Sequence, residues 1–488
     1  MRFWFLALVL ATSSVRAQTG TFSYDSLCNR AMTSYKQPGM AMGVIENGSV
    51  VFSKGYGKRN LERNESIDDH TVFPVASLSK AFTAAAIGIL VDRGMLKWDD
   101  KVISHDPSFA LYDPQVTHQF TVRDLLCHRN GYETFDGDLL WYGTKYSREE
   151  IVNRFSRLKP KHGFREKYGY SNIMFIEAAV LIEKKTGMSW ESFVRQHILK
   201  PLEMTETVVD HSAFLLLTNK ATPHVNGAAQ SYINYNNAAG AVGVNSNVAD
   251  LLKWATMWLN QGTYKGKVIL KESTVRELFA AKTVQQVSPK NEENGIHFKA
   301  AASGWMVQDL KGFKMVHHSG GLPGFILNLA LLPEKKSAVV VLTNGETALP
   351  FALTNTVMDL HIAGKSKDYL PNTGQNGPDA GQKPIAPHKI SFSDTLLLGN
   401  YQDLMYGGAK IFKQNGRLTL ELSPTATLFT ADLTPCGPAH FRFKFKDPFL
   451  PEGTLVVQFN PQGGIKSFTI DLPNPDFNFY NLLFTKQP

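Results

Sequence analysis

Two residues near the start of an apolar stretch, Ser77 and Lys80, have the types and the spacing that nucleophilic catalysis needs. They open a helical pattern that continues through Ala84, Ile89 and Leu90, and residues three apart lie on one face of a helix. A serine hydroxyl is a weak nucleophile until a base takes its proton, and a poorly solvated lysine amine can be that base. A serine at a helix start also directs backbone N–H groups toward a developing oxyanion. Because a helix cap beside a solvated lysine has the same pattern, the pair predicts an active site only together with other residues.

A second polar group, Tyr170-Ser171-Asn172, comes directly before an apolar helical stretch that begins at Ile173. A neighbouring ammonium lowers the pKa of a tyrosine from its usual value of about 10. We therefore expect Tyr170 and Lys80 to form a general base, with the phenolate favoured. Asn172 is expected to donate from its amide to a substrate carbonyl and to accept from Lys80. Alone, the triplet is more typical of a helix entrance with a polar cap.

The third group, His318-Ser319-Gly320-Gly321, ends one predicted strand and leads through a turn into the next. Glycines at a strand edge let a substrate lie against the backbone without a side chain in the way. The N–H of Gly321 is a candidate oxyanion donor beside the helix start. We assign all four residues to substrate binding. His317 is interpreted as a strand residue on the opposite face, because side chains alternate along a strand.

These three groups, in this order and with these spacings, resemble the serine beta-lactamase and penicillin-binding protein superfamily, in particular its class C-like branch of esterases and D-amino-acid peptidases. The resemblance extends through segments 121–131 and 201–207. It implies that Ser77 is acylated and that Lys80 and Tyr170 move its proton. It also implies that Asn172 orients the substrate and that the strand at His318 binds it.

One departure from the family pattern bears on the substrate. Antibiotic-binding members usually carry Lys, Thr or Ser, and Gly on that strand, whereas this chain has His318, Ser319 and Gly320. A histidine is only partly charged near neutral pH and holds a carboxylate less firmly than a lysine does. We therefore expect weak beta-lactamase activity at best, and ester or peptide substrates.

The strands and helices expected from the sequence, which must position these groups, indicate an α+β fold. Antiparallel strands are expected from both ends of the first domain, with a helical region between them. Asn47-Gly48 is a strong hairpin signal between the first two strands. The expected strands are 40–46, 49–54, 314–318, 325–333 and 338–343, and the expected helices are 79–92, 172–186 and 189–198.

Composition along the chain predicts four parts. Residues 1–17 have an Arg, a short apolar run and small residues before Gln18, which is typical of a signal peptide and of a secreted protein. Residues 18–364 form the predicted catalytic domain, and 365–388 are a polar, Gly- and Pro-rich linker. Residues 389–488 alternate apolar and polar side chains, with a turn at Asn415-Gly416. They predict a small antiparallel β-barrel domain.

The formal net charge of +8 is scattered along the chain, which argues against nucleic-acid binding. No stretch is long and apolar enough for an integral membrane segment, and no metal or cofactor motif is found. Cys28, Cys127 and Cys436 are too dispersed for a disulfide framework, and we expect each to be buried. Asn47 and Asn64 are glycosylation acceptors only in a eukaryotic host.

The leading hypothesis is a secreted serine hydrolase that works through an acyl-enzyme on Ser77, with no cofactor and with small ester or peptide substrates. The alternative is a catalytically silent scaffold or binding protein of the same fold. The presence of Ser77, Lys80 and Tyr170 together favours the enzyme. The C-terminal domain is a candidate cover for the active-site mouth. The natural substrate and the oligomeric state stay open.

Overall fold

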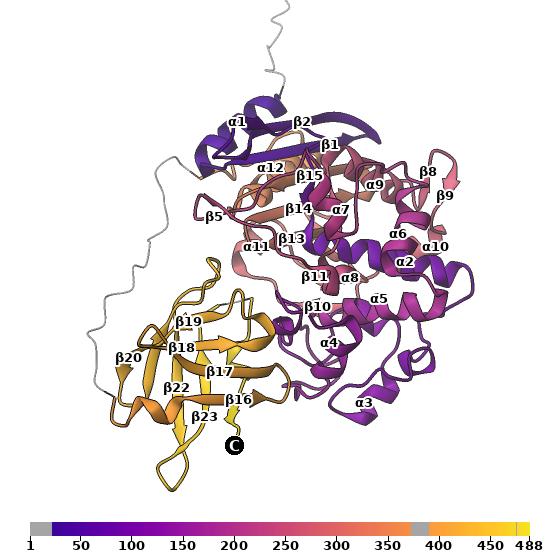
Figure 1. The fold of residues 1–488 in the computed structure, drawn as a ribbon. Coiled ribbons are helices and arrows are strands. Elements are labelled where there is room, and N and C mark those ends of the chain that lie inside the picture. The colour runs from indigo at the N-terminus through magenta and orange to yellow at the C-terminus, as the bar shows by residue number, and fades with distance from the viewer. Residues whose placement is uncertain (1–21, 372–389, 475) are drawn as a thin grey trace, which may run out of the picture.

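The computed structural model describes residues 22–371, 390–474 and 476–488. The predicted signal peptide and most of the predicted linker lie outside these ranges, so the domain boundaries stay predictions. Residues 365–371, at the start of the predicted linker, run beside the first domain, where Tyr369 donates a hydrogen bond to Asp359 at 2.9 Å. Figure 1 shows the sheet and helices of the first part of the chain, and a separate strand-rich body, coloured orange to yellow, below them.

A nine-stranded antiparallel sheet joins both ends of the first domain, with the order β10-β11-β12-β13-β14-β15-β1-β2-β3. Met40 in β1 lies opposite Thr343 in β15. Asn47 and Gly48 have φ of 50° and 80°, the left-handed conformation that a tight hairpin between β1 and β2 needs. The strands are β1 (Gly39–Glu46), β2 (Ser49–Asn60), β3 (Glu65–Ser66), β10 (Thr283–Gln285), β11 (Lys299–Ala301), β12 (Met306–Leu310), β13 (Phe313–Leu322), β14 (Phe325–Leu332) and β15 (Ser337–Thr343).

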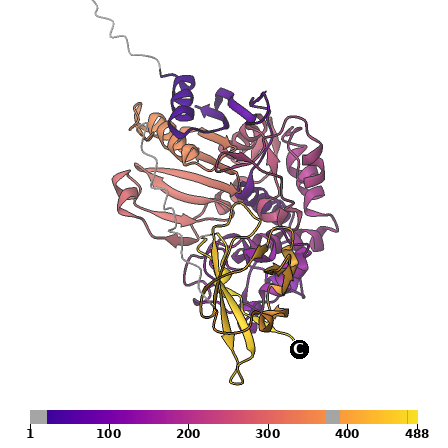
Figure 2. The ribbon, with the colours of Figure 1, turned by 60° about the vertical axis from the view of Figure 1, so that its left-hand side comes forward.

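Helices cover both faces of this sheet, as the turned view in Figure 2 also shows. Met40, Met42 and Val44 pack in one apolar cluster with α1 (Tyr24–Tyr35) and α12 (Leu349–Ala363). Ala41 and Ile45 belong to the other cluster, which includes α9 (Val248–Leu259). Alternate side chains of β1 thus pack into two different cores, because successive side chains of a strand point to opposite faces of the sheet. The arrangement confirms the predicted α+β fold.

The middle of the chain is helical, as expected. Helix α2 runs over Ser79–Asp92 and is buried on nearly every side, which its Ala- and Ile-rich sequence permits. The helix predicted at 189–198 is instead split into α6 (Trp190–Val194) and a π-helical segment, Arg195–Leu199. The other helices are α3 (Pro114–Gln119), α4 (Arg148–Phe155), α5 (Ile173–Thr186), α7 (His211–Leu216), α8 (Ala239–Val242), α10 (Glu272–Leu278) and α11 (Pro289–Glu293). Short strand pairs join β4 (Phe73–Pro74) to β7 (Asn245–Ser246), β5 (His224–Val225) to β6 (Ala228–Ala229) and β8 (Thr263–Tyr264) to β9 (Lys267–Val268).

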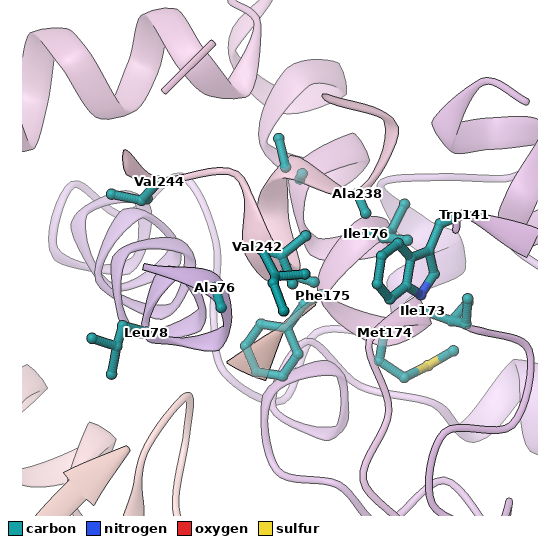
Figure 3. Packing of buried hydrophobic residues seen from close by; sticks show 14 of the residues in the cluster. Ala76, Leu78, Trp141, Ile173, Met174, Phe175, Ile176, Ala238, Val242 and Val244 are labelled. Atoms are coloured by element: carbon teal, nitrogen blue, oxygen red, sulfur yellow. The ribbon is translucent and has the colours of Figure 1, made fainter. Parts of the chain in front are cut away.

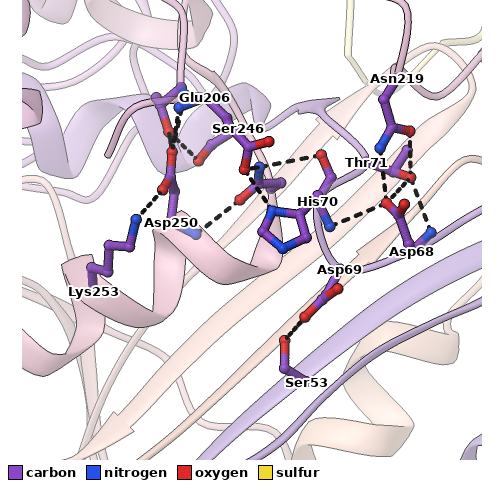
Figure 4. A network of polar contacts seen from close by, with 12 residues as sticks. Ser53, Asp68, Asp69, His70, Thr71, Glu206, Asn219, Ser246, Asp250 and Lys253 are labelled. Atoms are coloured by element: carbon purple, nitrogen blue, oxygen red, sulfur yellow. Dashed lines mark hydrogen bonds and ion pairs between the residues drawn. The ribbon is translucent and has the colours of Figure 1, made fainter. Parts of the chain in front are cut away.

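A polar network holds the segment that precedes β4 against the start of α9 (Figure 4). The buried Asp250 carboxylate accepts hydrogen bonds from the backbone N–H groups of Glu206 and Thr207, each at 3.0 Å. The Asn247 side chain caps α9 and also donates to the carbonyl of His70 and to Glu206. Because each buried polar group in these bonds has a partner, the loop that leads toward Ser77 is fixed.

The C-terminal part is a second nine-stranded sheet that nearly closes on itself, with the order β19-β18-β17-β16-β24-β23-β22-β21-β20. Leu420, Phe441, Phe468 and Ile470 fill its interior. The predicted hairpin at Asn415-Gly416 is confirmed between β17 and β18. The strands are β16 (Gly399–Asp403), β17 (Gly407–Gln414), β18 (Arg417–Leu422), β19 (Thr430–Asp432), β20 (Thr434–Gly437), β21 (His440–Phe443), β22 (Gly453–Phe459), β23 (Ile465–Asp471) and β24 (Phe484–Lys486).

The three cysteines form no disulfide. Cys28 and Cys127 are buried, as expected, whereas Cys436 is only half-buried, because it lies on β20 at one end of the second sheet. Within the described ranges, none of the helices has the length and apolar character that crossing a membrane requires.

Candidate active site

Ser77 lies in a single 3-10 turn, Ala76–Leu78, directly before α2. Ala76 has a φ of 49°, a left-handed conformation that is uncommon for a residue with a Cβ. The turn is held in place because Ser79 Oγ accepts a hydrogen bond from the Val244 N–H at 2.9 Å. Ala76 packs in the same apolar cluster as Val242, which Figure 3 labels beside it. The serine is thereby presented at the start of a buried helix.

Lys80 is fully buried, and its amine donates to Ser77 Oγ at 3.0 Å and to the Ala241 carbonyl at 3.1 Å. Burial lowers the pKa of Lys80 to about 7, although the nearby Asp138 carboxyl acts in the opposite direction. A large share of the lysine is therefore uncharged near neutral pH. This amine is placed to accept the proton of Ser77.

Tyr170 also lies beside the lysine, with Lys80 Nζ 4.9 Å from the centre of its ring. Burial raises the pKa of Tyr170 well above 10, and a hydrogen bond with Ser77 opposes this only in part. The expected phenolate is therefore wrong for the free protein, because desolvation outweighs the effect of the lysine. In its neutral form the phenol can donate or relay a proton.

Asn172 is buried beside these groups, but not with the partner that we expected. Its amide Nδ2 donates to Asp138 Oδ2 at 2.6 Å, and its Oδ1 has no hydrogen-bond partner among the described residues. The amine of Lys80 is instead bonded to Ser77 and Ala241. Asn172 is therefore oriented by Asp138, with its free oxygen available to a substrate.

Asp138 is a residue of this site that the sequence did not reveal. It begins a 3-10 turn, Asp138–Leu140. This turn lies in a loop whose position in the fold could not be predicted from its composition. Burial raises the pKa of Asp138 to about 7, and the positive charge of Lys80 works against that rise. Lys80 and Asp138 thus form a coupled pair that titrates close to neutral pH.

His128 also contributes to the site and was not predicted as a site residue. Its ring stacks on that of Tyr170, with 4.3 Å between the ring centres, and its Nδ1 accepts the Ser171 N–H at 3.1 Å. Burial lowers its pKa well below 6.5, and Lys80 and His318 act in the same direction. The neutral ring of His128 thus packs against the ring of Tyr170. The only signal in the sequence was its place in segment 121–131.

Strand β13 forms the opposite side of the site. A Cβ on Gly320 would lie 2.5 Å from the Val75 carbonyl oxygen and 3.1 Å from the Ala76 Cβ. Only glycine therefore lets β13 approach the turn that carries Ser77 this closely. Gly321 follows at the exposed edge, where its N–H is the candidate oxyanion donor.

His318 does not carry the partial charge that we expected. Burial lowers its pKa to about 3, with Lys80 as a further cause, so the ring is neutral. Its Nδ1 lies 2.6 Å from the Ser319 carbonyl oxygen and donates to it, which leaves Nε2 as an acceptor without a partner in the described chain. His318 thus offers a substrate a lone pair rather than a positive charge.

A cavity of about 610 Å³ joins these groups. The structure brings most of the predicted site residues to its wall: Ser77, Tyr170, Asn172, His318, Ser319, Gly320 and Gly321. Lys80 lies behind Ser77 and bonds to it. His317, which strand alternation assigned to the opposite face, also lines the cavity.

The C-terminal domain supplies part of this wall through Phe449, Asp476 and Phe477. Buried contacts hold the two domains together. Tyr142 donates to Asp447 at 2.8 Å, and its ring lies 4.4 Å from that of Phe477. Asn478 and Asn481 both donate to Asp136, at 2.7 and 2.8 Å. The cavity is therefore shared between the domains.

The geometry fits acyl transfer. In the described part of the chain, no group of three or more His, Cys, Asp or Glu side chains is arranged to hold a metal ion. The groups that converge are a serine hydroxyl, a buried amine, a phenol and a strand edge with an available N–H. These are the parts that nucleophilic catalysis with an oxyanion site uses.

Comparisons with known proteins agree with this geometry. The family model described as Beta-lactamase matches residues 25–363. The unguisins hydrolase ungD′ of Aspergillus campestris is 30% identical over 72% of this chain, but the match spans only 66% of that protein's length. Penicillin-binding protein 4* of Bacillus subtilis is 27% identical over 87% of this chain and 91% of its own. The octameric penicillin-binding protein homologue from Pyrococcus abyssi has the same fold, with a TM-score of 0.60 at 20% identity and coverage of 95% of this chain and 99% of its own. The chain belongs to the beta-lactamase family, whose members similar to it include penicillin-binding proteins and a hydrolase.

Proposed function

We propose that this protein is a secreted serine hydrolase that forms an acyl-enzyme on Ser77 and cleaves ester or amide bonds of small molecules. The observation that carries the proposal is the buried amine of Lys80, 3.0 Å from Ser77 Oγ and with a pKa of about 7. A relative named as a hydrolase over 72% of this chain agrees with it.

The proposed reaction has two halves. The Ser77 hydroxyl gives its proton to Lys80 Nζ while Oγ bonds to the substrate carbonyl carbon. The oxyanion is held by the N–H groups of Ser77 and Gly321. As it collapses, the bond from the carbonyl carbon to the leaving oxygen or nitrogen breaks, and that atom takes the proton from Lys80, either directly or through the Tyr170 hydroxyl, which passes on its own proton and takes up that of Lys80. Water then attacks the acyl-enzyme, gives up a proton by the same route, and releases the acid with Ser77 restored.

The direct test is intact-protein mass spectrometry of residues 18–488 and of the Ser77→Ala variant. Each is exposed to a p-nitrophenyl ester, a penicillin and a D-alanyl peptide, and quenched at several times. We expect an adduct that forms and decays with the ester or the peptide in the wild type only, and little turnover of the penicillin. If no reagent forms an adduct, the proposal fails, and a catalytically silent binding protein is the better account.

Secretion is a separate part of the proposal, and it depends on residues 1–17. Expressed from Met1 in a cell that exports proteins, the chain should leave the cytoplasm with Gln18 at its N-terminus. N-terminal sequencing of the exported protein checks this. Retention of residues 1–17 on a cytoplasmic protein would contradict it.

A further inference from the structure

Three buried polar atoms in the cavity wall have no hydrogen-bond partner among the residues that the structure describes: Asp138 Oδ1, Asn172 Oδ1 and Trp141 Nε1. All three side chains line the same cavity as Ser77, and none is more than 4% exposed. Leaving a buried donor or acceptor without a partner is unfavourable. Two acceptors and one donor on the wall of one space are suitable partners for a bound water molecule.

The carboxyl group of Asp138 is fixed through one of its two oxygens. Oδ2 accepts the hydrogen bond from Asn172 Nδ2 at 2.6 Å. Gly137, directly before Asp138, has a φ of 85°, and a Cβ on it would lie 2.5 Å from the ring of Phe155, so the chain is closely packed at this point. Oδ1 of Asp138 therefore has a defined position in the wall.

The indole of Trp141 lies close to the same carboxyl group. Burial raises the pKa of Asp138, and the Trp141 N–H works against this rise. The two groups nevertheless form no direct hydrogen bond, since neither Nε1 nor Asp138 Oδ1 has a partner in the described chain. The indole is held edge-on to the rings of Tyr142 and Tyr235, at 5.9 and 5.7 Å between ring centres. A donor and an acceptor that are close but not bonded can be joined by a bridging water.

The Asp138 carboxyl also lies within electrostatic reach of the groups that act on Ser77. Burial has the largest effect on the pKa of Lys80 and on that of Tyr170, and the negative charge of Asp138 raises both values. Lys80 Nζ is in turn 3.0 Å from Ser77 Oγ. The space in front of Asp138 is therefore next to the place of an acyl group on Ser77.

The charges around Asp138 suit the binding of a reactive water. Burial brings the pKa of Asp138 and that of Lys80 to about 7 from opposite sides, so above this pH Asp138 is a carboxylate and Lys80 an uncharged amine. Asp476, on the C-terminal domain, is a further negative charge near Asp138, while Tyr170 is a neutral phenol. A carboxylate oxygen accepts hydrogen bonds and donates none. Oδ1 can then hold a water O–H while the amine takes a proton.

We propose that Asp138 Oδ1 and Trp141 Nε1 hold the water that hydrolyses the acyl-enzyme. This inference rests on the proposed acyl-enzyme function and adds Asp138 as a catalytic residue of its second half. Oδ1 accepts a hydrogen bond from the hydrogen that stays on the product acid. The other hydrogen goes to Lys80, directly or through Tyr170, as the water oxygen bonds to the acyl carbon. The bond from that carbon to Oγ then breaks, and Ser77 takes the proton back from Lys80.

Asp138→Asn tests this role, because the amide keeps an oxygen for Asn172 and presents an NH₂ donor where the water needs an acceptor. With p-nitrophenyl acetate, kcat/KM reports acylation, and the decay of the isolated acyl-enzyme reports the reaction with water. At about pH 8.5, where Lys80 is uncharged in both proteins, kcat/KM should stay within about twofold of the wild type. Decay, followed by intact-protein mass spectrometry, should be about a hundredfold slower, because the water is no longer positioned.

Hydroxylamine distinguishes a lost water site from a distorted active site. It is a stronger nucleophile than water and attacks the acyl carbon without help from a carboxylate. Added hydroxylamine should therefore release the acyl group from Asp138→Asn about as fast as from the wild type. Trp141→Phe removes the other partner of the water and keeps the carboxyl, so it should slow decay by about fivefold.

Glu346→Gln is the matched control. Glu346 is an acid that lines the same cavity, and its amide variant keeps an oxygen for the Gly324 N–H, which Glu346 accepts at 2.9 Å. The acyl-enzyme of this variant should decay at the rate of the wild type.

The outcomes separate the two proposals. If Asp138→Asn decays as fast as the wild type, or if hydroxylamine does not speed its decay, the water site is overturned and the acyl-enzyme function stands. The same holds if kcat/KM falls by the same factor as the decay rate, because Asp138 would then act on the whole site. If the wild type forms no adduct that Ser77→Ala lacks, both are overturned.

Discussion

At the scale of single residues, the decisive property of the site is the depth at which its ionisable groups lie. Lys80, Asp138 and His318 are all nearly inaccessible to water, and burial shifts each pKa toward the neutral form. Desolvation, more than partner charges, thus sets the protonation state at neutral pH. An uncharged lysine beside a serine is a base, whereas a charged one is not.

This leads to a prediction about pH. In the wild type, kcat/KM for p-nitrophenyl acetate should rise as the pH increases through about 7, because the deprotonated form of Lys80 is the active one. The Asp138 carboxylate favours the charged lysine, so Asp138→Asn should lower the pKa of Lys80 further and move the rise to lower pH. The asparagine keeps an oxygen for the Asn172 amide. A pH–rate profile of both proteins checks the direction.

Asp99→Asn is the matched control for this experiment. Asp99 is an exposed acid that pairs with Arg123 at the surface, and its loss should leave the profile in place. A shift of the rise toward higher pH in Asp138→Asn would contradict the assignment of the base to Lys80.

The residue scale also shows what the sequence could and could not reveal. Ser77 and Lys80 are three residues apart on one helix, so their contact followed from local spacing. Asp138 and His128 reach the site through loops distant in the chain, and no local period marks them. The predicted protonation states of Tyr170 and His318 were wrong because they depend on burial, which is a property of the folded molecule and not of the local sequence.

At the scale of elements, the site depends on how closely β13 approaches the turn before α2. Gly320 makes that approach possible, since a Cβ there would lie 2.5 Å from a backbone oxygen. A backbone oxygen cannot move aside as the end of a flexible side chain can. The strand edge that carries Gly321 would have to move away from Ser77 to accept any larger residue.

Gly320→Ala should therefore lower the free energy of unfolding by about 1 to 3 kcal/mol, the usual penalty for overpacking a well-packed site. It should also reduce kcat/KM, because the oxyanion donor is displaced. Urea unfolding and ester hydrolysis measure the two effects. Gly321→Ala is the matched control for stability, since the nearest atom to its added Cβ is 3.7 Å away. Equal loss of stability in both variants would contradict the explanation.

The elements themselves followed well from the sequence where their patterns were strong. The hairpins at Asn47-Gly48 and Asn415-Gly416 formed where the turn residues predicted them. Helix α2 has the predicted bounds. The helix expected at 189–198 is present as one continuous helical stretch, but its second half adopts a π-helical form, which the spacing of apolar residues does not distinguish from an α-helix.

At the scale of the whole molecule, one cavity is built by two domains. Phe449, Asp476 and Phe477 close a side that the catalytic domain leaves open. The sequence suggested a cover for the active-site mouth but not which residues form it, because residues hundreds of positions apart meet there. We therefore expect the contact between the domains to influence substrate selection.

The prediction at this scale concerns substrate size. Phe449→Ala should widen the cavity and raise kcat/KM for p-nitrophenyl hexanoate relative to the acetate by about tenfold, as expected for removing apolar bulk from a pocket wall. Phe459→Ala is the matched control, because this phenylalanine lies on β22, 38% exposed and outside the cavity. Comparable chain-length profiles for wild type and Phe449→Ala would show that the C-terminal domain does not limit substrate length.

The pairing of β1 with β15 has a consequence for how the protein is made. Met40 leaves the ribosome long before Thr343, its partner in the sheet, and Ser77 lies on the segment between them. Pairing of such distant segments forms slowly, since the intervening chain must first be closed into a loop. The strand edge that completes the site, at Gly320 and Gly321, also arrives late. During synthesis the nucleophile therefore exists without the strand edge that completes its oxyanion site until Gly321 has been translated, and the site is complete only once nearly the whole catalytic domain has been made.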